Sequence, residues 1–239
     1  MFIPLHDANP LRHVAFPYVT WGLIGITVAV HAAIWLAAQT TLIPNAETGA
    51  TVAFGVIPSV VEGIRRMPAI YDLVPPPVTL VSYAFLHADM WHLAGNMVFL
   101  WVFGDNVEDA FGHLKFLAFY LISAAVAGGA HVLLNPTSDL PLIGASGAIA
   151  AIVSAYLILH PRVRLWILAL GRIPLPIPAW LALGAWILFQ FYNVAVHQGD
   201  NVAWWAHIGG LAAGAALVLV LRRPGVRLFD SGTDLGAAA

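Results

Sequence analysis

The stretch Gly144-Ala145-Ser146-Gly147 begins an apolar segment that runs to His160. Further along the chain, His207 lies inside a second apolar segment, from Ala203 to Leu221. A polar or ionisable side chain within a membrane span is unfavourable and by default marks a functional site. Ser146 and His207 are therefore the first candidates for chemistry, as a nucleophile and a base.

The two segments carry matching small residues. Gly210 and Gly214 lie three and seven positions after His207, so they share its helix face. Small residues also line one face of the first segment, at Gly147, Ala151 and Ser154. Small residues let membrane helices approach closely. We predict backbone-to-backbone packing that brings the serine and the histidine into contact.

The composition of the chain is typical of a membrane protein. Of its 239 residues, 60% are hydrophobic and 9% are charged, whereas soluble domains carry about 25% charged residues. The chain has no cysteine, which excludes disulfides, thiolate metal sites and cysteine nucleophiles. Six apolar segments approach the roughly 20 residues needed to cross a bilayer. We place the spans at 18–38, 89–108, 114–134, 145–160, 177–193 and 203–222.

The sequence thus predicts an all-α membrane protein, a six-helix transmembrane bundle over residues 18–222. An N-terminal cytoplasmic arm, 1–17, precedes it, and a disordered tail, 223–239, follows it. Cytoplasmic loops carry an excess of Lys and Arg. With both termini in the cytoplasm, eight of the ten basic residues lie inside. They are Arg12, Lys115, Arg162, Arg164, Arg172, Arg222, Arg223 and Arg227, while Arg65 and Arg66 lie outside.

Two further stretches carry expectations about local structure. In the first loop, 39–88, apolar residues recur at helical spacing between Val60 and Met67, which favours an amphipathic helix in the outer interface. Asp105, Glu108 and Asp109 cluster at the inner end of the second span. They are typical of a solvated helix end.

The position of Ser146 favours catalysis over simple helix packing. A residue in the first turn of a helix lies beside unpaired backbone N–H groups and the positive end of the helix dipole. Those groups can stabilise an oxyanion, and Gly144 and Gly147 leave room for a substrate backbone. A serine needs a neighbouring base, and a desolvated His207 is favoured in the neutral form that accepts a proton. The structural alternative for His207 is an interhelical hydrogen bond.

A third group of polar residues begins the second span. His92 and Asn96 are four positions apart and share a helix face. They would serve either as interhelical hydrogen-bonding groups or as oxyanion donors. His87 lies off that face and nearer the pocket mouth. A zinc site of the three histidines is disfavoured, because the spacing of His87 and His92 differs from the four-residue spacing of zinc proteases.

Together these residues resemble the rhomboid family of intramembrane serine proteases. The resemblance extends from about Tyr18 to Leu221. Four motifs carry it in order: His87, His92 and Asn96; Phe103, Gly104 and Glu108; Gly144, Ser146 and Gly147; and Ala206, His207, Gly210 and Gly214.

The resemblance implies a Ser146–His207 dyad that cleaves single-pass or multi-pass membrane proteins within or next to a transmembrane segment. His92, Asn96 and the Ser146 backbone N–H would be oxyanion donors, with Gly144 and His87 beside the substrate. The fifth span would be the lateral gate for substrate helices, through Trp180, Trp186, Phe189 and Phe191. The expected surroundings are the lipid bilayer, with no nucleic acid, metal or cofactor.

One departure from the family pattern concerns the catalytic histidine. Many relatives have an aromatic residue four positions after the serine, stacked on the histidine, whereas this chain has Ala150. Another residue must orient His207, and the sequence does not identify it. Two other functions stay open: a rhomboid-like protein that binds membrane proteins without cleaving them, and a small transporter. The compact six-span form suggests a bacterial plasma membrane.

Overall fold

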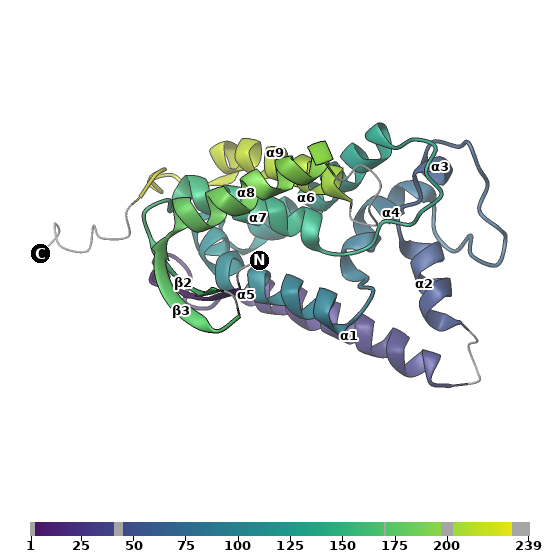
Figure 1. Ribbon diagram of the computed structural model, residues 1–239, viewed down its shortest axis with the longest axis horizontal. Helices are drawn as coiled ribbons and strands as arrows, with labels where there is room; N and C mark the ends of the chain where they lie inside the picture. The colour runs from purple at the N-terminus through teal and green to yellow at the C-terminus, as the bar shows by residue number, and fades with distance from the viewer. Residues whose placement is uncertain (1–2, 41–44, 170, 197–202, 231–239) are drawn as a thin grey trace, which may run out of the picture.

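The fold is a bundle of long helices with one small sheet at one end (Figure 1). The computed structural model describes residues 3–40, 45–169, 171–196 and 203–230. The elements in chain order are β1 (Ile3–Asp7), α1 (Tyr18–Ala38), α2 (Ala46–Phe54), α3 (Pro58–Val61), α4 (Pro76–Ser82), the 3₁₀ turn η1 (Tyr83–Phe85), α5 (Met90–Phe111), α6 (His113–Leu134), α7 (Ser146–Leu159), β2 (Arg164–Ala169), β3 (Ile173–Pro178), α8 (Ala179–Val196) and α9 (Trp204–Leu221).

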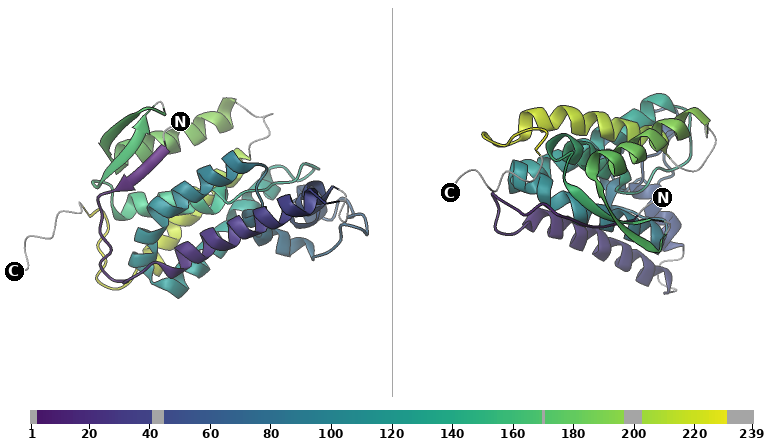
Figure 2. Two further views of the ribbon diagram at one scale, coloured as in Figure 1. Left: turned by 90° about the horizontal axis from the view of Figure 1, so that it is seen from below. Right: turned by 60° about the vertical axis from the view of Figure 1, so that its left-hand side comes forward.

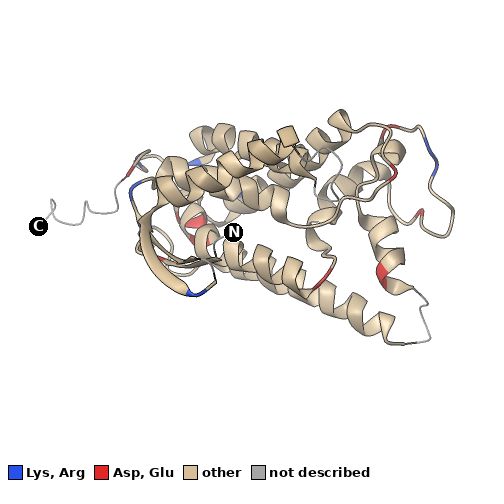
Figure 3. Ribbon diagram, in the orientation of Figure 1, with Lys and Arg blue, Asp and Glu red and all other residues tan. Residues whose placement is uncertain are grey.

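The six predicted spans coincide with α1, α5, α6, α7, α8 and α9 to within three residues at each end. By length and apolar composition, α1, α6, α8 and α9 are able to cross a membrane. Of the other two helices, α7 is shorter, with 14 residues, and α5 carries acidic residues in its last two turns. Charged residues gather toward the ends of the helices (Figure 3), and α1, α7, α8 and α9 contain none. The chain is therefore mostly helical with several membrane-spanning helices.

Helix α7 forms the centre of the bundle. Nearly all of its residues are buried, including Ala148, Ala150 and Ala151, which are fully enclosed. Its contact with α9 is made by backbone, since a Cβ added to Gly210 would overlap the carbonyl oxygen of Gly147. The predicted backbone-to-backbone packing of these two helices is confirmed.

The all-α prediction is wrong in one respect, because three strands form an antiparallel sheet in the order β1-β2-β3. In β2, Leu165 and Ile167 are buried while Arg164 and Trp166 are exposed, the alternation of a half-buried strand. The prolines at every second position of β3 remove N–H donors from its free edge, so the sheet ends there. The sheet lies next to α8 (Figure 2), and β3 continues directly into that helix.

The described N-terminal and C-terminal segments pack against the bundle. The predicted N-terminal arm contains β1, which pairs with β2. The prediction of a disordered tail from residue 223 is wrong as far as residue 230. There the backbone N–H of Phe229 donates to Ile158, that of Asp230 donates to Leu159, and Val226 is buried. Arg12 forms an ion pair with Asp230 at 3.1 Å. Residues 231–239 lie outside the described residues.

The acidic end of α5 is not solvated, contrary to expectation. Glu108 is fully buried and accepts hydrogen bonds from the backbone N–H groups of Val19 and Thr20, at 3.0 and 2.7 Å. A carboxylate at this place satisfies unpaired donors at the start of α1. Gly104 allows the approach, because Thr20 lies 3.2 Å from the position of its missing Cβ.

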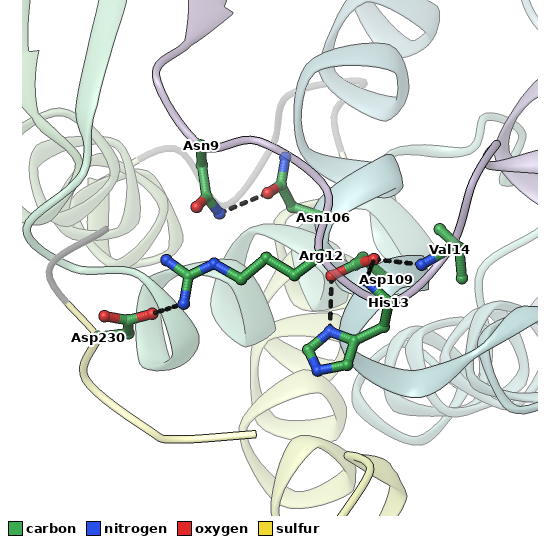
Figure 4. A network of polar contacts seen from close by, with 7 residues as sticks. All are labelled: Asn9, Arg12, His13, Val14, Asn106, Asp109 and Asp230. Carbon is green, nitrogen blue, oxygen red and sulfur yellow. Dashed lines mark hydrogen bonds and ion pairs between the residues drawn. The ribbon is translucent and has the colours of Figure 1, made fainter. Parts of the chain in front are cut away.

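Asp109 anchors the N-terminal arm in the same way. Its carboxylate accepts from the backbone N–H groups of His13 and Val14, at 2.6 and 2.7 Å (Figure 4). Nearby, the Asn9 amide donates to Asn106 of α5. The acidic cluster therefore fixes the arm to the end of α5.

The predicted amphipathic helix of the first loop is also wrong. Helix α3 ends at Val61, and Gly63 then adopts a positive φ of 70°. The N–H groups of Ile64 and Arg65 turn back to the carbonyl of Ser59. A left-handed glycine ends a helix readily, so the apolar spacing does not continue as one helical face.

Candidate active site

The candidate site begins with the segment that leads into α7. Gly144 has a φ of +118°, and its N–H donates to the carbonyl of Tyr83 at 3.0 Å. The N–H of Ala145 points to Nε2 of His87, at 3.4 Å. These bonds hold irregular backbone at the start of the helix, which is tolerated at membrane depth where it is buried in protein. They place Ser146 in the first turn of α7.

Ser146 and His207 lie in direct contact. The Oγ of Ser146 is 2.8 Å from Nε2 of His207. Both residues are only partly buried. The contact follows from the glycine packing described above, because Gly147 and Gly210 bring the two backbones together next to these side chains. A hydroxyl at this distance from an imidazole nitrogen has the arrangement of a nucleophile with its general base.

A residue that the sequence analysis missed contacts the other side of His207. Nδ1 of His207 lies 2.8 Å from Oε1 of Gln190, on α8. The Gln190 amide nitrogen donates to the carbonyl of Trp186, one turn earlier in α8, at 3.0 Å. The sequence did contain a signal for Gln190, because a side-chain amide inside an apolar span needs a hydrogen-bonding partner.

Two tryptophans flank the same imidazole. The ring of Trp204 meets the ring of His207 edge-on, with centroids 5.7 Å apart, and the ring of Trp186 lies at 6.4 Å. The sequence alone did not indicate Trp204 as a site residue. These rings contact the histidine in a chain that has Ala150 where many relatives carry an aromatic residue.

His92 and Asn96 come to the site from α5. Asp89 caps this helix by accepting from the N–H groups of Trp91 and His92, at 2.8 and 2.9 Å, which places His92 in the first turn. The Asn96 amide donates to the carbonyl of His92 at 3.0 Å. A Cβ added to Gly144 would lie 2.7 Å from Nε2 of His92 and 3.9 Å from Nδ2 of Asn96. The two side chains therefore converge on the backbone just before the serine.

His87 occupies a different place from the other candidates. It is buried, its ring meets that of His92 edge-on with centroids 5.0 Å apart, and Nε2 faces the N–H of Ala145. This position supports the segment before Ser146. His87 therefore contacts His92 and the backbone of Ala145, and no hydrogen bond or ring contact with Ser146 or His207 is seen among the described residues.

A family model described as the rhomboid domain matches residues 76–224. The chain belongs to the rhomboid family. The match includes every candidate residue from His87 to His207.

Several curated relatives share this region. "Rhomboid protein 1, mitochondrial" of Saccharomyces cerevisiae is 29% identical over 60% of this chain and 41% of its own length. "RHOMBOID-like protein 12, mitochondrial" of Arabidopsis thaliana is 30% identical over 57% of this chain and 44% of its own. "Presenilin-associated rhomboid-like protein, mitochondrial" of Mus musculus is 28% identical over 48% and 33%. This rhomboid chain spans less than half the length of these three relatives.

The relatives correct one prediction. The compact form suggested a bacterial plasma membrane, yet these three rhomboid proteins are named as mitochondrial. They point to a mitochondrial membrane, so the plasma-membrane assignment is wrong. A multi-pass membrane location is supported by the long apolar helices.

Proposed function

We propose that this rhomboid chain is an intramembrane serine endopeptidase, which cleaves membrane-protein substrates within or next to a transmembrane segment. The observation that carries the proposal is the 2.8 Å separation of Ser146 Oγ and His207 Nε2. Family membership supports the same reaction class. Substrates would be single-pass or multi-pass membrane proteins.

The first half of the reaction forms an acyl-enzyme. Ser146 Oγ attacks the scissile carbonyl carbon while His207 Nε2 takes the hydroxyl proton. The carbonyl oxygen becomes an oxyanion, for which the Ser146 backbone N–H, His92 and Asn96 are the proposed donors. His207 then passes its proton to the amide nitrogen as the peptide bond breaks, and the amine product leaves.

The second half hydrolyses the acyl-enzyme. A water molecule attacks the ester carbonyl while His207 takes a proton from it, and the same donors stabilise the second oxyanion. Collapse of this intermediate returns the proton to Ser146 and releases the carboxylic acid product. The partial exposure of both dyad residues agrees with a route for this water.

Substrate would reach the dyad beside α8. This helix exposes large apolar side chains, among them Trp180, Phe189 and Phe191, as expected of a helix that meets lipid or a substrate helix. The six-span topology, with both termini on the same side of the membrane, belongs to the same proposal. Because the chain lacks cysteine, single cysteines placed in the arm and in the first loop would report the two sides by their accessibility to an impermeant thiol reagent.

The test of catalysis uses the purified full chain in detergent or vesicles. We expect wild type to react with a fluorophosphonate probe and to cleave a model transmembrane substrate, and Ser146→Ala to do neither. Retention of cleavage by Ser146→Ala would reject Ser146 as the nucleophile. A wild type that neither labels nor cleaves, yet captures membrane proteins, would favour binding without proteolysis.

A further inference from the structure

Gln190 is held in a defined orientation between two helices. The residue is 2% exposed. The amide nitrogen donates to the Trp186 carbonyl within α8, and a carbonyl oxygen only accepts hydrogen bonds. The other end of the amide, Oε1, must therefore be the atom that faces His207 Nδ1.

This orientation determines which nitrogen of His207 carries the proton. Oε1 of an amide is an acceptor, so Nδ1 of His207 has to be the N–H donor in the bond between them. In the neutral imidazole the other nitrogen is then unprotonated. That nitrogen is Nε2, which faces the Ser146 hydroxyl at 2.8 Å.

We infer that Gln190 is a positioning residue that selects the tautomer and ring orientation in which His207 can deprotonate Ser146, and that it makes the dyad depend on the placement of α8. This inference rests on the proposed proteolytic function. It answers the question raised by Ala150, because the histidine is oriented by a hydrogen bond from a neighbouring helix.

The dependence on α8 follows from how this helix is packed. Over its 18 residues, α8 buries a narrow stripe made of Ala179, Ala182, Leu183, Gln190 and Asn193. Around the dyad its contacts with α9 include the Gln190 bond to His207. The ring of Trp186 also meets His207, and the ring of Phe189 meets Trp204. A shift of α8 away from α9 would break the bond to Nδ1 and release the imidazole.

The experiment compares two replacements of similar size. Gln190→Met keeps an unbranched apolar chain but removes the acceptor, whereas Gln190→Glu keeps an oxygen acceptor. Asn193→Ala is the matched control, because Asn193 is also a buried amide of α8 that donates to a carbonyl one turn earlier, that of Phe189. Each variant is assayed for kcat, KM and the rate of fluorophosphonate labelling, with the thermal unfolding midpoint as a folding check.

We expect Gln190→Met to lower kcat and the labelling rate about ten-fold or more, the effect of losing one orienting hydrogen bond, with KM little changed. Gln190→Glu should recover a substantial part of the loss, and Asn193→Ala should react at nearly the wild-type rate. A Gln190→Met variant with wild-type kcat and labelling would overturn the inference while leaving the Ser146–His207 dyad in place.

A second measurement detects the tautomer directly in the wild-type protein. Imidazole ¹⁵N NMR of the wild type, with His207 assigned by the signal lost in His207→Asn, distinguishes the two neutral tautomers. We expect the proton on Nδ1. A proton on Nε2 would refute the role of Gln190 whatever the variants do. Failure of the proposed function is separate and would be seen as wild-type protein that does not label at all.

Discussion

Replacing Gly210 by alanine tests the central claim that backbone packing of α9 on α7 assembles the dyad. A Cβ at Gly210 would lie 3.0 Å from the carbonyl carbon of Gly147 and would overlap its oxygen. Nonbonded carbon and oxygen atoms require roughly 3.3–3.6 Å. The added Cβ would be 2.0 Å from the Gly147 oxygen. Because the obstacle is backbone rather than a flexible side chain, the two helices must separate by about 1.3 Å or more at this level.

The separation acts on the adjacent dyad. Gly147 follows Ser146 directly, and Gly210 lies one turn after His207. Adding about 1.3 Å to the 2.8 Å between Oγ and Nε2 takes the pair beyond hydrogen-bond distance. A misplacement of this size lowers rates about 100-fold. Overpacking also destabilises the fold by about 1–3 kcal/mol.

The assay is cleavage of a transmembrane substrate together with fluorophosphonate labelling of purified Gly210→Ala. The matched control is Gly129→Ala in α6, where nothing lies within 4 Å of the added carbon. We expect Gly129→Ala to keep wild-type activity. A Gly210→Ala protein that is folded and equally active would refute the claim that this contact sets the dyad distance.

Three further outcomes are expected. Gly144→Ala should abolish labelling, because its φ of +118° disfavours a side chain and the new carbon would lie 2.7 Å from His92 Nε2; normal labelling would contradict the convergence of α5 on this segment. Glu108→Ala should lower the free energy of unfolding by about 2 kcal/mol, by leaving buried N–H groups at the start of α1 unpaired; thermal unfolding in detergent with an unchanged midpoint would rule out that capping role. Burial raises the pKa of Asp7 from 3.8 to about 7, so the folded state favours the protonated acid and stability should fall as pH rises from about 4 to about 7. Unfolding midpoints across this range should show a shallower fall for Asp7→Asn, and identical slopes would show that Asp7 does not titrate this way.

Much of the bundle could be predicted because its signals are local. Long apolar runs marked the helices, and the helix ends agreed to within three residues. The contact of α7 with α9 could also be predicted, because small residues at helical spacing on both helices favour close packing of their backbones. Ser146 and His207 could be paired because each lies beside those small residues.

Three of the errors arose where a residue's partner is distant in sequence. Strand β1 pairs with β2, about 160 residues away. The sequence pattern within one of these segments does not predict its pairing with the other. The acidic end of α5 looked solvated because the arm that covers it, with His13 and Val14, could not be placed. The tail was assigned as disordered for the same reason.

The sequence by itself determined that this is a helical membrane protein with a serine and a histidine on facing small-residue surfaces, because hydropathy and spacing are properties of each segment alone. Only the tertiary structure decided what orients that histidine. Gln190 could have turned toward any neighbouring helix, and its hydrogen bond to His207 depends on the rotation and depth of α8 against α9. Those are set by packing of the whole bundle, including the sheet that leads into α8, and not by the residues next to Gln190 in the chain.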